Sequence, residues 1–204
     1  MILVKIQEEW VRIHLRGAYK RNPEAFGDLV TMDHVNMVQN GMGTGLVAKG
    51  VLFNFLDLAT RYRVRAAVSS MDVEDTDVAF GHAAGDQPVR QIYADGWKAF
   101  KPVTAGRRIN FEPSTPGDHP NNGIIARANA DVLDGTRALL VQAGLPACFW
   151  PWAAPCYCRL DNVCGKGSQA SVDPEQTRWQ LRHAVEHFQG QVDPFGARVR
   201  FVPA

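Results

Sequence analysis

The sequence predicts an α/β domain built on a mixed β-sheet, and three features of the chain indicate it. Residues 29–38 and 50–70 carry apolar side chains in the patterns typical of strands. Helix-like and strand-like stretches then alternate, before residues 121–143 repeat apolar side chains every 3.6 positions, as an amphipathic helix does. Strands in series, then alternation, then helices favour helices packed on a sheet.

Five strands are expected in order. Residues 29–38, LVTMDHVNMV, mix apolar and polar side chains. Residues 50–70 divide into the apolar VLFNFL, a turn near Asp57 to Thr60, and YRVRAAV, in which arginine alternates with apolar residues. The last two candidates are VRQIYAD (89–95) and INFEP (109–113).

Helices are expected between and after these strands. Residues 71–84 begin with acidic side chains, which the positive amino end of a helix favours. The long helix over 121–143 ends at a clear stop, Gly144 followed by Pro146. The aromatic stretch 149–163 is expected to be helical but broken by its two prolines.

The chain is expected to divide into an N-terminal segment (1–24), a core domain (25–164) and a linker with a tail (165–204). Within the tail, TRWQLRHAVEHF (177–188) reads as a short helix and ARVRFV (197–202) as strand-like.

Composition favours an intracellular globular protein. Of 204 residues 46% are hydrophobic, enough for a sizeable core. No apolar run approaches the ~20 residues that span a bilayer, and Glu8 and Glu9 interrupt any signal-peptide core. The four cysteines, Cys148, Cys156, Cys158 and Cys164, lack the C-x-x-C spacing of zinc or redox sites, so buried free thiols are expected.

The net charge of +1 hides one basic stretch, GWKAFKPVTAGRRIN (96–110), which contains no acid. Such a stretch with interleaved Trp and Phe suits phosphate contacts, although a solvated surface explains basic residues more often. Its cations are Lys98, Lys101, Arg107 and Arg108.

Two further motifs favour ordinary explanations. NGMGTG (40–45) lacks the spacing of a phosphate-binding loop and leads into a strand, so a hairpin connection is expected. HAVEH (183–187) fits an inverted zinc-protease pattern, but a catalytic zinc needs three protein ligands, so we expect a surface helix that carries two histidines on one face.

Two aspartates stand where metal chemistry needs them. Asp33 lies inside the first strand and Asp95 at the end of a later one. A carboxylate in a strand suited to burial is unfavourable unless it is paired or liganded, although a cap or turn role explains either aspartate taken alone.

The order of the flanking motifs resembles the integrase core of copia-type retrotransposons. In that family a strand aspartate is followed by a D-x-x-S-R-Y hairpin, an S-D-x-G segment, P-x-x-N-G-x-x-E-R-x-N, and a helix ending L-L-x-x-A-G-L-P-x-x-F-W. The corresponding stretches here, within about residues 27–164, are LVTMDH, FLDLATRYRV, IYADGWKAF, TPGDHPNNGIIARAN and ALLVQAGLPACFWPWA.

The resemblance implies a ribonuclease-H-like fold with a five-stranded mixed sheet, and DNA integration by two-metal phosphoryl transfer with Mg²⁺ or Mn²⁺. By position, Asp33 and Asp95 are the implied catalytic and metal-binding carboxylates, and Asp57 is structural. DNA is the implied partner. A homo-oligomer is compatible with this resemblance, and no association with a membrane is expected. Residues implied to lie near the DNA are Asn122, Gly123, Arg127 and Asn129, with the basic stretch beside Asp95 as a substrate loop.

The departures from the family pattern predict impaired catalysis. The glutamate of the family falls on Ala126, the residues after Asp95 read A-D-G-W, and only His14 lies where integrases carry a His/Cys zinc module. Thirty-five residues separate Asp131 from Asp95, but Asp131 lies five residues beyond Ala126 and so points about 140° away from it. Asp118, in the preceding loop, reaches the site only if that loop moves.

The sequence therefore predicts a decayed integrase core that keeps the fold and nucleic-acid affinity, acting in the nucleus if genomic DNA is its target. The alternative is a non-catalytic DNA-binding or scaffold protein that reuses the same surface.

Overall fold

The computed structural model describes residues 23–41, 49–114, 119–165, 173, 175–185 and 187–198. One five-stranded sheet lies at its centre, in the order β3-β2-β1-β4-β5. The strands are β1 (Val30–Gly41), β2 (Lys49–Asp57), β3 (Arg63–Val68), β4 (Gln91–Ala94) and β5 (Asn110–Pro113). The first three pair antiparallel, whereas β1 with β4 and β4 with β5 pair parallel, which confirms the predicted mixed sheet.

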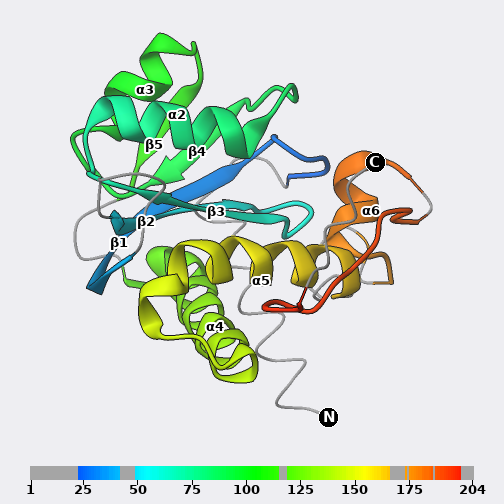
Figure 1. Ribbon diagram of the computed structural model, residues 1–204. Helices are drawn as coiled ribbons and strands as arrows, with labels where there is room; N and C mark the ends of the chain where they lie inside the picture. Colours follow the sequence, from blue (N-terminus) through cyan, green and yellow to red (C-terminus); the bar gives the residue numbers. More distant parts are fainter. Residues whose placement is uncertain are drawn as a thin grey trace, which may run out of the picture.

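Helices cover both faces of this sheet (Figure 1). On one face lie α2 (Val73–Ala84) and α3 (Phe100–Gly106), and on the other α4 (His119–Ala143) and α5 (Trp150–Cys164), joined by the 3-10 turn η1 (Ala147–Phe149). Because β2 is buried on both faces, its sequence VLFNFL reads as continuously apolar instead of alternating.

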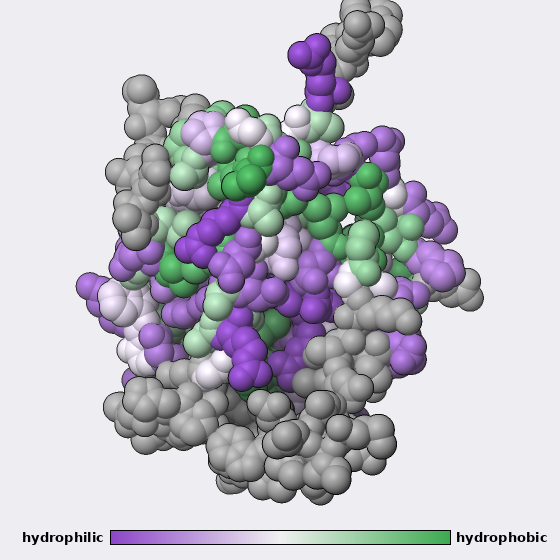
Figure 2. All heavy atoms as spheres, turned by 90° about the horizontal axis from the view of Figure 1, so that it is seen from below, coloured by the Kyte–Doolittle hydropathy of each residue, from purple (hydrophilic) through white to green (hydrophobic). Residues whose placement is uncertain are grey.

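Each face of the sheet has its own core. Phe53 and Phe55 of β2 pack with Phe80 of α2 and Phe100 of α3. On the opposite face, Leu52 packs with residues of α4 and α5 such as Val132, Trp150 and Cys158. The outer surface on the α4 and α5 side mixes hydrophilic with hydrophobic side chains (Figure 2).

Two local devices agree with the sequence. Asp57, predicted to be structural, is fully buried at the β2–β3 turn. Its Oδ2 accepts from the backbone N–H and the hydroxyl of Thr60, both at 2.7 Å, and its Oδ1 accepts from Gly27 N at 2.9 Å. Asp72 caps α2 by accepting from Asp75 N at 2.8 Å, which explains the acidic start of that helix.

The long helix α4 begins at His119, two residues earlier than expected. It ends at Ala143, directly before the predicted stop at Gly144. Gly144 has φ 65°, and the N–H of Leu145 returns to the carbonyl of Leu140 at 3.0 Å. Gly135 lets α5 approach closely, because a Cβ there would lie 2.1 Å from the ring of Tyr157.

Three corrections concern the helices. The prolines of the aromatic segment do not break it: Pro151 lies in the first turn of α5, and Pro155 removes only the bond to the carbonyl of Pro151. The basic stretch contains an unpredicted helix, α3, whose buried residues Phe100, Val103 and Thr104 follow helical spacing.

The third correction concerns the tail, where α6 (Arg178–His183) is half the expected length. It ends at Ala184, which adopts a left-handed conformation with φ 51°. Arg182 holds this helix on the core, with its guanidinium 4.3 Å from the ring centre of Tyr62 and 4.4 Å from that of Phe26. The strand expected over 197–202 falls mostly outside the described residues.

The cysteines are all free, as predicted, but only Cys158 is buried. Cys148 and Cys156 are half-buried and Cys164 is exposed. Burial raises the pKa of the Cys158 thiol to about 11, against the smaller opposing effect of Arg65.

Thiol reactivity tests this core. An alkylating reagent at pH 8 should modify Cys164 rapidly and leave Cys158 unmodified until the protein unfolds. The raised pKa alone lowers the thiolate fraction of Cys158 about a hundredfold, and burial restricts access further. Peptide mass spectrometry over time measures both rates, and equal rates in the native protein would contradict the packing of α5.

Candidate functional site

A row of four polar side chains crosses the sheet beneath α4. Asp33 of β1 pairs with Asn54 of β2, and Asn54 pairs with Arg65 of β3. On the other side of β1, Val30 pairs with Ile92 of β4, so Asp33 and Asp95, each three residues later, follow matching positions. We call these four residues the polar row: Asp95, Asp33, Asn54 and Arg65. Its charge is negative at the β4 end and positive at the β3 end.

The row faces α4 because side chains alternate along each strand. Leu29 and Tyr93 pack with Ile125 of α4. Asp33 lies an even number of residues beyond Leu29 and therefore shares that face. Asp95 follows β4 two residues after Tyr93, close enough to Asp33 for its charge to raise the pKa of that carboxyl. The two carboxylates that the sequence singled out therefore come together at one edge of the sheet, near the amino-terminal half of α4.

Asp33 is largely buried, and both of its carboxylate oxygens accept hydrogen bonds. Oδ2 accepts from the amide of Asn129 at 2.7 Å, and Oδ1 accepts from the backbone N–H of His34 at 2.8 Å. Burial raises the pKa of Asp33, and the charge of nearby Asp95 raises it further, against the lowering effect of these hydrogen bonds and of Arg65. The site therefore concentrates negative charge that a cation would relieve.

Asp95 is the open member of the pair. It directly follows β4, is exposed, and accepts from the backbone N–H of Trp97 at 3.1 Å through Oδ1. One carboxylate thus faces the interior and the other faces solvent, so an ion or a substrate can approach from the Asp95 side.

Asn129 links Asp33 to the positive end of the row. It is buried, and while its nitrogen donates to Asp33, its oxygen accepts from Nη2 of Arg65 at 3.4 Å. Arg65 is only 2% exposed and donates through Nη1 to the carbonyls of Phe55 and Val64, at 3.0 and 3.1 Å. Burial lowers the pKa of Arg65 to about 10, so it stays charged at neutral pH.

The resemblance implied that Asn129 lies near the DNA. In the structure Asn129 is buried and its amide is turned into the protein. Two buried atoms of the row, Oδ1 of Asn54 and Nε of Arg65, have no hydrogen-bond partner among the described residues. Both residues were missed by the sequence reading. Their signals were a single polar residue inside VLFNFL and the second arginine of YRVRAAV.

Position 126 is a solvent-exposed alanine on α4, one turn before Asn129. Asp131 points away from Asp33, because it forms an ion pair with Arg63 and accepts from the hydroxyl of Tyr157 at 3.3 Å, toward β3 and α5. Asp118 and the side chain of Asn122 lie outside the described residues. Among the described residues, no group of three His, Cys, Asp or Glu is placed to hold a metal ion.

The predicted basic contacts differ in their availability. Lys98, Lys101, Arg108 and Arg127 are exposed. Arg107 is already engaged: Nε donates to Oδ1 of Asp77 at 2.6 Å and its guanidinium lies 5.2 Å from the ring centre of Phe80. Arg107 therefore ties α3 to α2, and the other four remain the candidates for phosphate contact.

The HAVEH motif does not form the expected helical face. His183 is the last residue of α6, and its ring centre lies 4.0 Å from that of Trp179. His187 lies beyond the left-handed Ala184, outside the helix. The glycine-rich loop is largely outside the described residues.

Comparisons with known proteins identify the architecture. No family model and no curated protein matches the chain. Among solved structures, the chain is similar to HTLV-2 integrase catalytic core domain in complex with magnesium, with 15% identity, a TM-score of 0.59, and coverage of 80% of this chain and 100% of that one. The fold is ribonuclease-H-like.

Two further structures share this ribonuclease-H-like fold. One is a chain of a simian T-cell lymphotropic virus intasome in complex with PP2A regulatory subunit B56 gamma, with 14% identity and a TM-score of 0.63 over 90% of this chain. This chain spans only 62% of that viral one. The other is the BIV integrase catalytic core domain, with 11% identity, a TM-score of 0.53, and coverage of 76% and 93%.

Replacement of Asn129 tests the polar row. Asn129→Leu should lower the free energy of unfolding by roughly 2–5 kcal/mol, because Asp33 and the buried Arg65 each lose a partner. Urea denaturation measures the loss. Gln142→Leu on the exposed side of the same helix is the control, with an expected change within about 0.5 kcal/mol. Equal effects of the two substitutions would mean that Asn129 does not support the row.

Proposed function

We propose that this chain is a retroelement integrase-like domain of copia type, which binds DNA and supports metal-dependent phosphoryl transfer at a strongly reduced rate. The observation that carries the proposal is the proximity of Asp33 in β1 and Asp95 directly after β4, its parallel neighbour, in an integrase-core fold. The charge of Asp95 raises the pKa of Asp33. Paired carboxylates on such a sheet edge are the oxygen ligands that Mg²⁺ and Mn²⁺ prefer.

The two carboxylates fit a single divalent cation. Each carboxylate oxygen has two lone-pair sites, so the oxygens that already accept one hydrogen bond can still ligate. Asp33 would hold the ion from the interior, fixed in orientation by Asn129, and Asp95 would hold it from the solvent side. A cation bound there supplies Lewis-acid stabilisation of phosphoryl oxygens and lowers the pKa of a bound water.

The reduced rate follows from the position of the third metal-binding carboxylate of the family, which is Ala126 here. Ala126 offers a methyl group and no ligand, and Asp131 is held by Arg63. A two-ion site normally shares its charge among three carboxylates, so a second ion should bind poorly here. Loss of one ion's role costs several kcal/mol of transition-state stabilisation, or about a thousandfold or more in rate.

The partners follow from the same proposal. The exposed cations Lys98, Lys101, Arg108 and Arg127 suit DNA phosphates, and binding through them should weaken steeply with salt. One similar structure belongs to an intasome, and the HTLV-2 core was solved in trimeric and dimeric forms, which supports self-association of this chain on DNA. No described helix is long and apolar enough to cross a membrane. We place the activity in the nucleus, where genomic DNA is the target.

The direct test restores the missing acid. Ala126→Glu should raise Mn²⁺-dependent 3′-end processing of a labelled DNA end by about a hundredfold or more, since the exposed position tolerates the side chain and a third carboxylate strengthens the second ion. A gel assay of cleaved ends measures the rate.

Two controls accompany this variant. Adding Asp95→Asn to Ala126→Glu should abolish the gain, whereas Ala130→Glu, on an exposed position of the same helix, should give none. Efficient processing by the unaltered protein would contradict impairment. No gain from Ala126→Glu, together with salt-sensitive DNA binding, would favour the second candidate, a non-catalytic DNA-binding scaffold, which the exposed cations alone support.

A further inference from the structure

Trp97 is an exposed aromatic residue two positions after Asp95, in the segment between β4 and α3. It is 37% exposed and belongs to none of the hydrophobic clusters of the described residues, whereas the phenylalanines of the core on the α2 side of the sheet are buried. An exposed aromatic ring offers a face on which the ring of a ligand can stack.

The indole is nevertheless held in place. Its Nε1 donates to the carbonyl of Met71 at 3.1 Å, and its backbone N–H donates to Oδ1 of Asp95 at 3.1 Å. The first bond ties the indole to the segment just before α2, and the second holds the backbone of Trp97 beside Asp95. An aromatic ring held before binding loses little conformational entropy when a ligand stacks on it.

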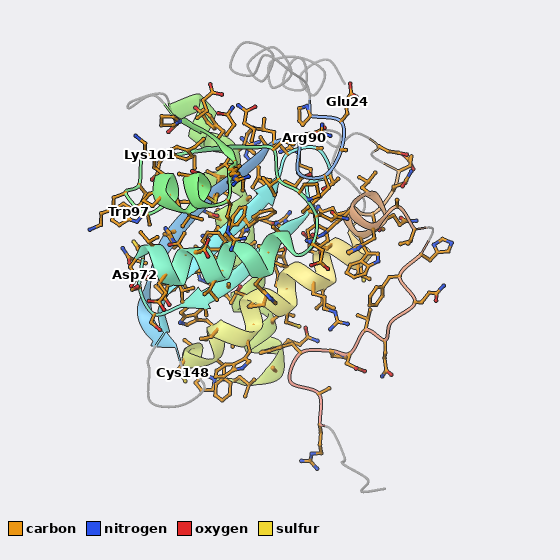
Figure 3. All side chains as sticks on the ribbon, turned by 90° about the horizontal axis from the view of Figure 1, so that it is seen from above. Glu24, Asp72, Arg90, Trp97, Lys101 and Cys148 are labelled. Atoms are coloured by element: carbon orange, nitrogen blue, oxygen red, sulfur yellow. The ribbon has the colours of Figure 1, made fainter. Side chains whose placement is uncertain are left out.

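The charges around the ring are divided between its two sides. Figure 3 shows Trp97 projecting from the edge of the molecule between Lys101 of α3 and Asp72 at the start of α2. Lys98 Nζ lies 6.0 Å from the centre of the indole ring, and Lys98 and Lys101 are both exposed. A phosphate backbone is therefore favoured on the α3 side and disfavoured on the acidic α2 side.

We propose that Trp97 is a stacking platform for an unpaired nucleobase at the end of a DNA strand, with Lys98 and Lys101 contacting the adjoining phosphates. The inference rests on the proposed function and adds a specificity to it: the site prefers DNA ends with an unpaired strand over blunt duplex. Stacking on an aromatic ring is tolerant of base identity, because every base has a π-face.

The test compares oligonucleotide binding in EDTA, so that the result does not depend on a metal ion. The ligands are a fluorescent DNA duplex with a short 3′ overhang and the same duplex with blunt ends. Trp97→Ala should weaken binding of the overhang duplex about five- to hundredfold and leave the blunt duplex unchanged, as expected for loss of stacking with one base.

Two variants make this result specific. Trp97→Phe keeps a ring and should retain most of the affinity for the overhang. Trp152→Ala removes a tryptophan from α5 and should leave binding unchanged. Trp152 is a matched control because it is 39% exposed and Trp97 is 37% exposed. The backbone N–H that bonds to Asp95 persists in every variant at position 97, so the carboxylate pair keeps that contact.

The outcomes separate the two proposals. If the unaltered protein binds neither duplex, both this inference and the proposed DNA binding are overturned. If it binds DNA but Trp97→Ala and Trp152→Ala have equal effects, or if Trp97→Ala weakens both duplexes alike, only the stacking platform is overturned.

Discussion

The buried guanidinium of Arg65 and the partly buried carboxylate of Asp33 lie on one face of the sheet and are joined by the amide of Asn129. These contacts set the geometry of the candidate site. Arg65 is 2% exposed, and its charge lies two strands from Asp33. An isolated charge of either sign would be strongly unfavourable in this position. The two charges offset one another. Asn129 of α4 connects them, because it accepts from Arg65 of β3 and donates to Asp33 of β1. The orientation of Asp33 is therefore fixed by contacts within the protein.

The same arrangement accounts for the fixed position of Asp33 beside an exposed alanine at position 126. Asp33 accepts hydrogen bonds from His34 and Asn129 and is attracted by the charge of Arg65. Its position therefore does not depend on an acid at residue 126. In the proposed function, the third ligand is what the site lacks, because Ala126 carries no carboxylate and Asp131 pairs with Arg63. Such a loss would be local, since the contacts of Asp33 within the protein do not involve residue 126.

Much of the fold could be predicted from local signals. The strands, the capped start of α2, the stop at Gly144 and the structural role of Asp57 each depend on neighbours in sequence. The joining of Asp33 with Asp95 followed from motif order, and the parallel pairing of β1 with β4 supplies its physical basis.

The rest depends on contacts that sequence spacing does not contain. Asn54 and Arg65 become site residues only through the register of three strands, and Asn129 turns inward because they lie beneath it. Pro155 does not break α5 because the buried face of that helix, including Trp150 and Cys158, packs on the sheet. Conversely, α6 ends at Ala184 although its sequence continues to favour helix.

Isothermal titration calorimetry of the protein with Mn²⁺ tests the central claim most directly. The account predicts one ion per chain, with binding lost in Asp33→Asn and in Asp95→Asn and retained in Asp131→Asn, whose carboxylate pairs with Arg63. Absence of binding by the unaltered protein, or binding that survives removal of Asp33, would contradict a carboxylate pair built to hold a cation.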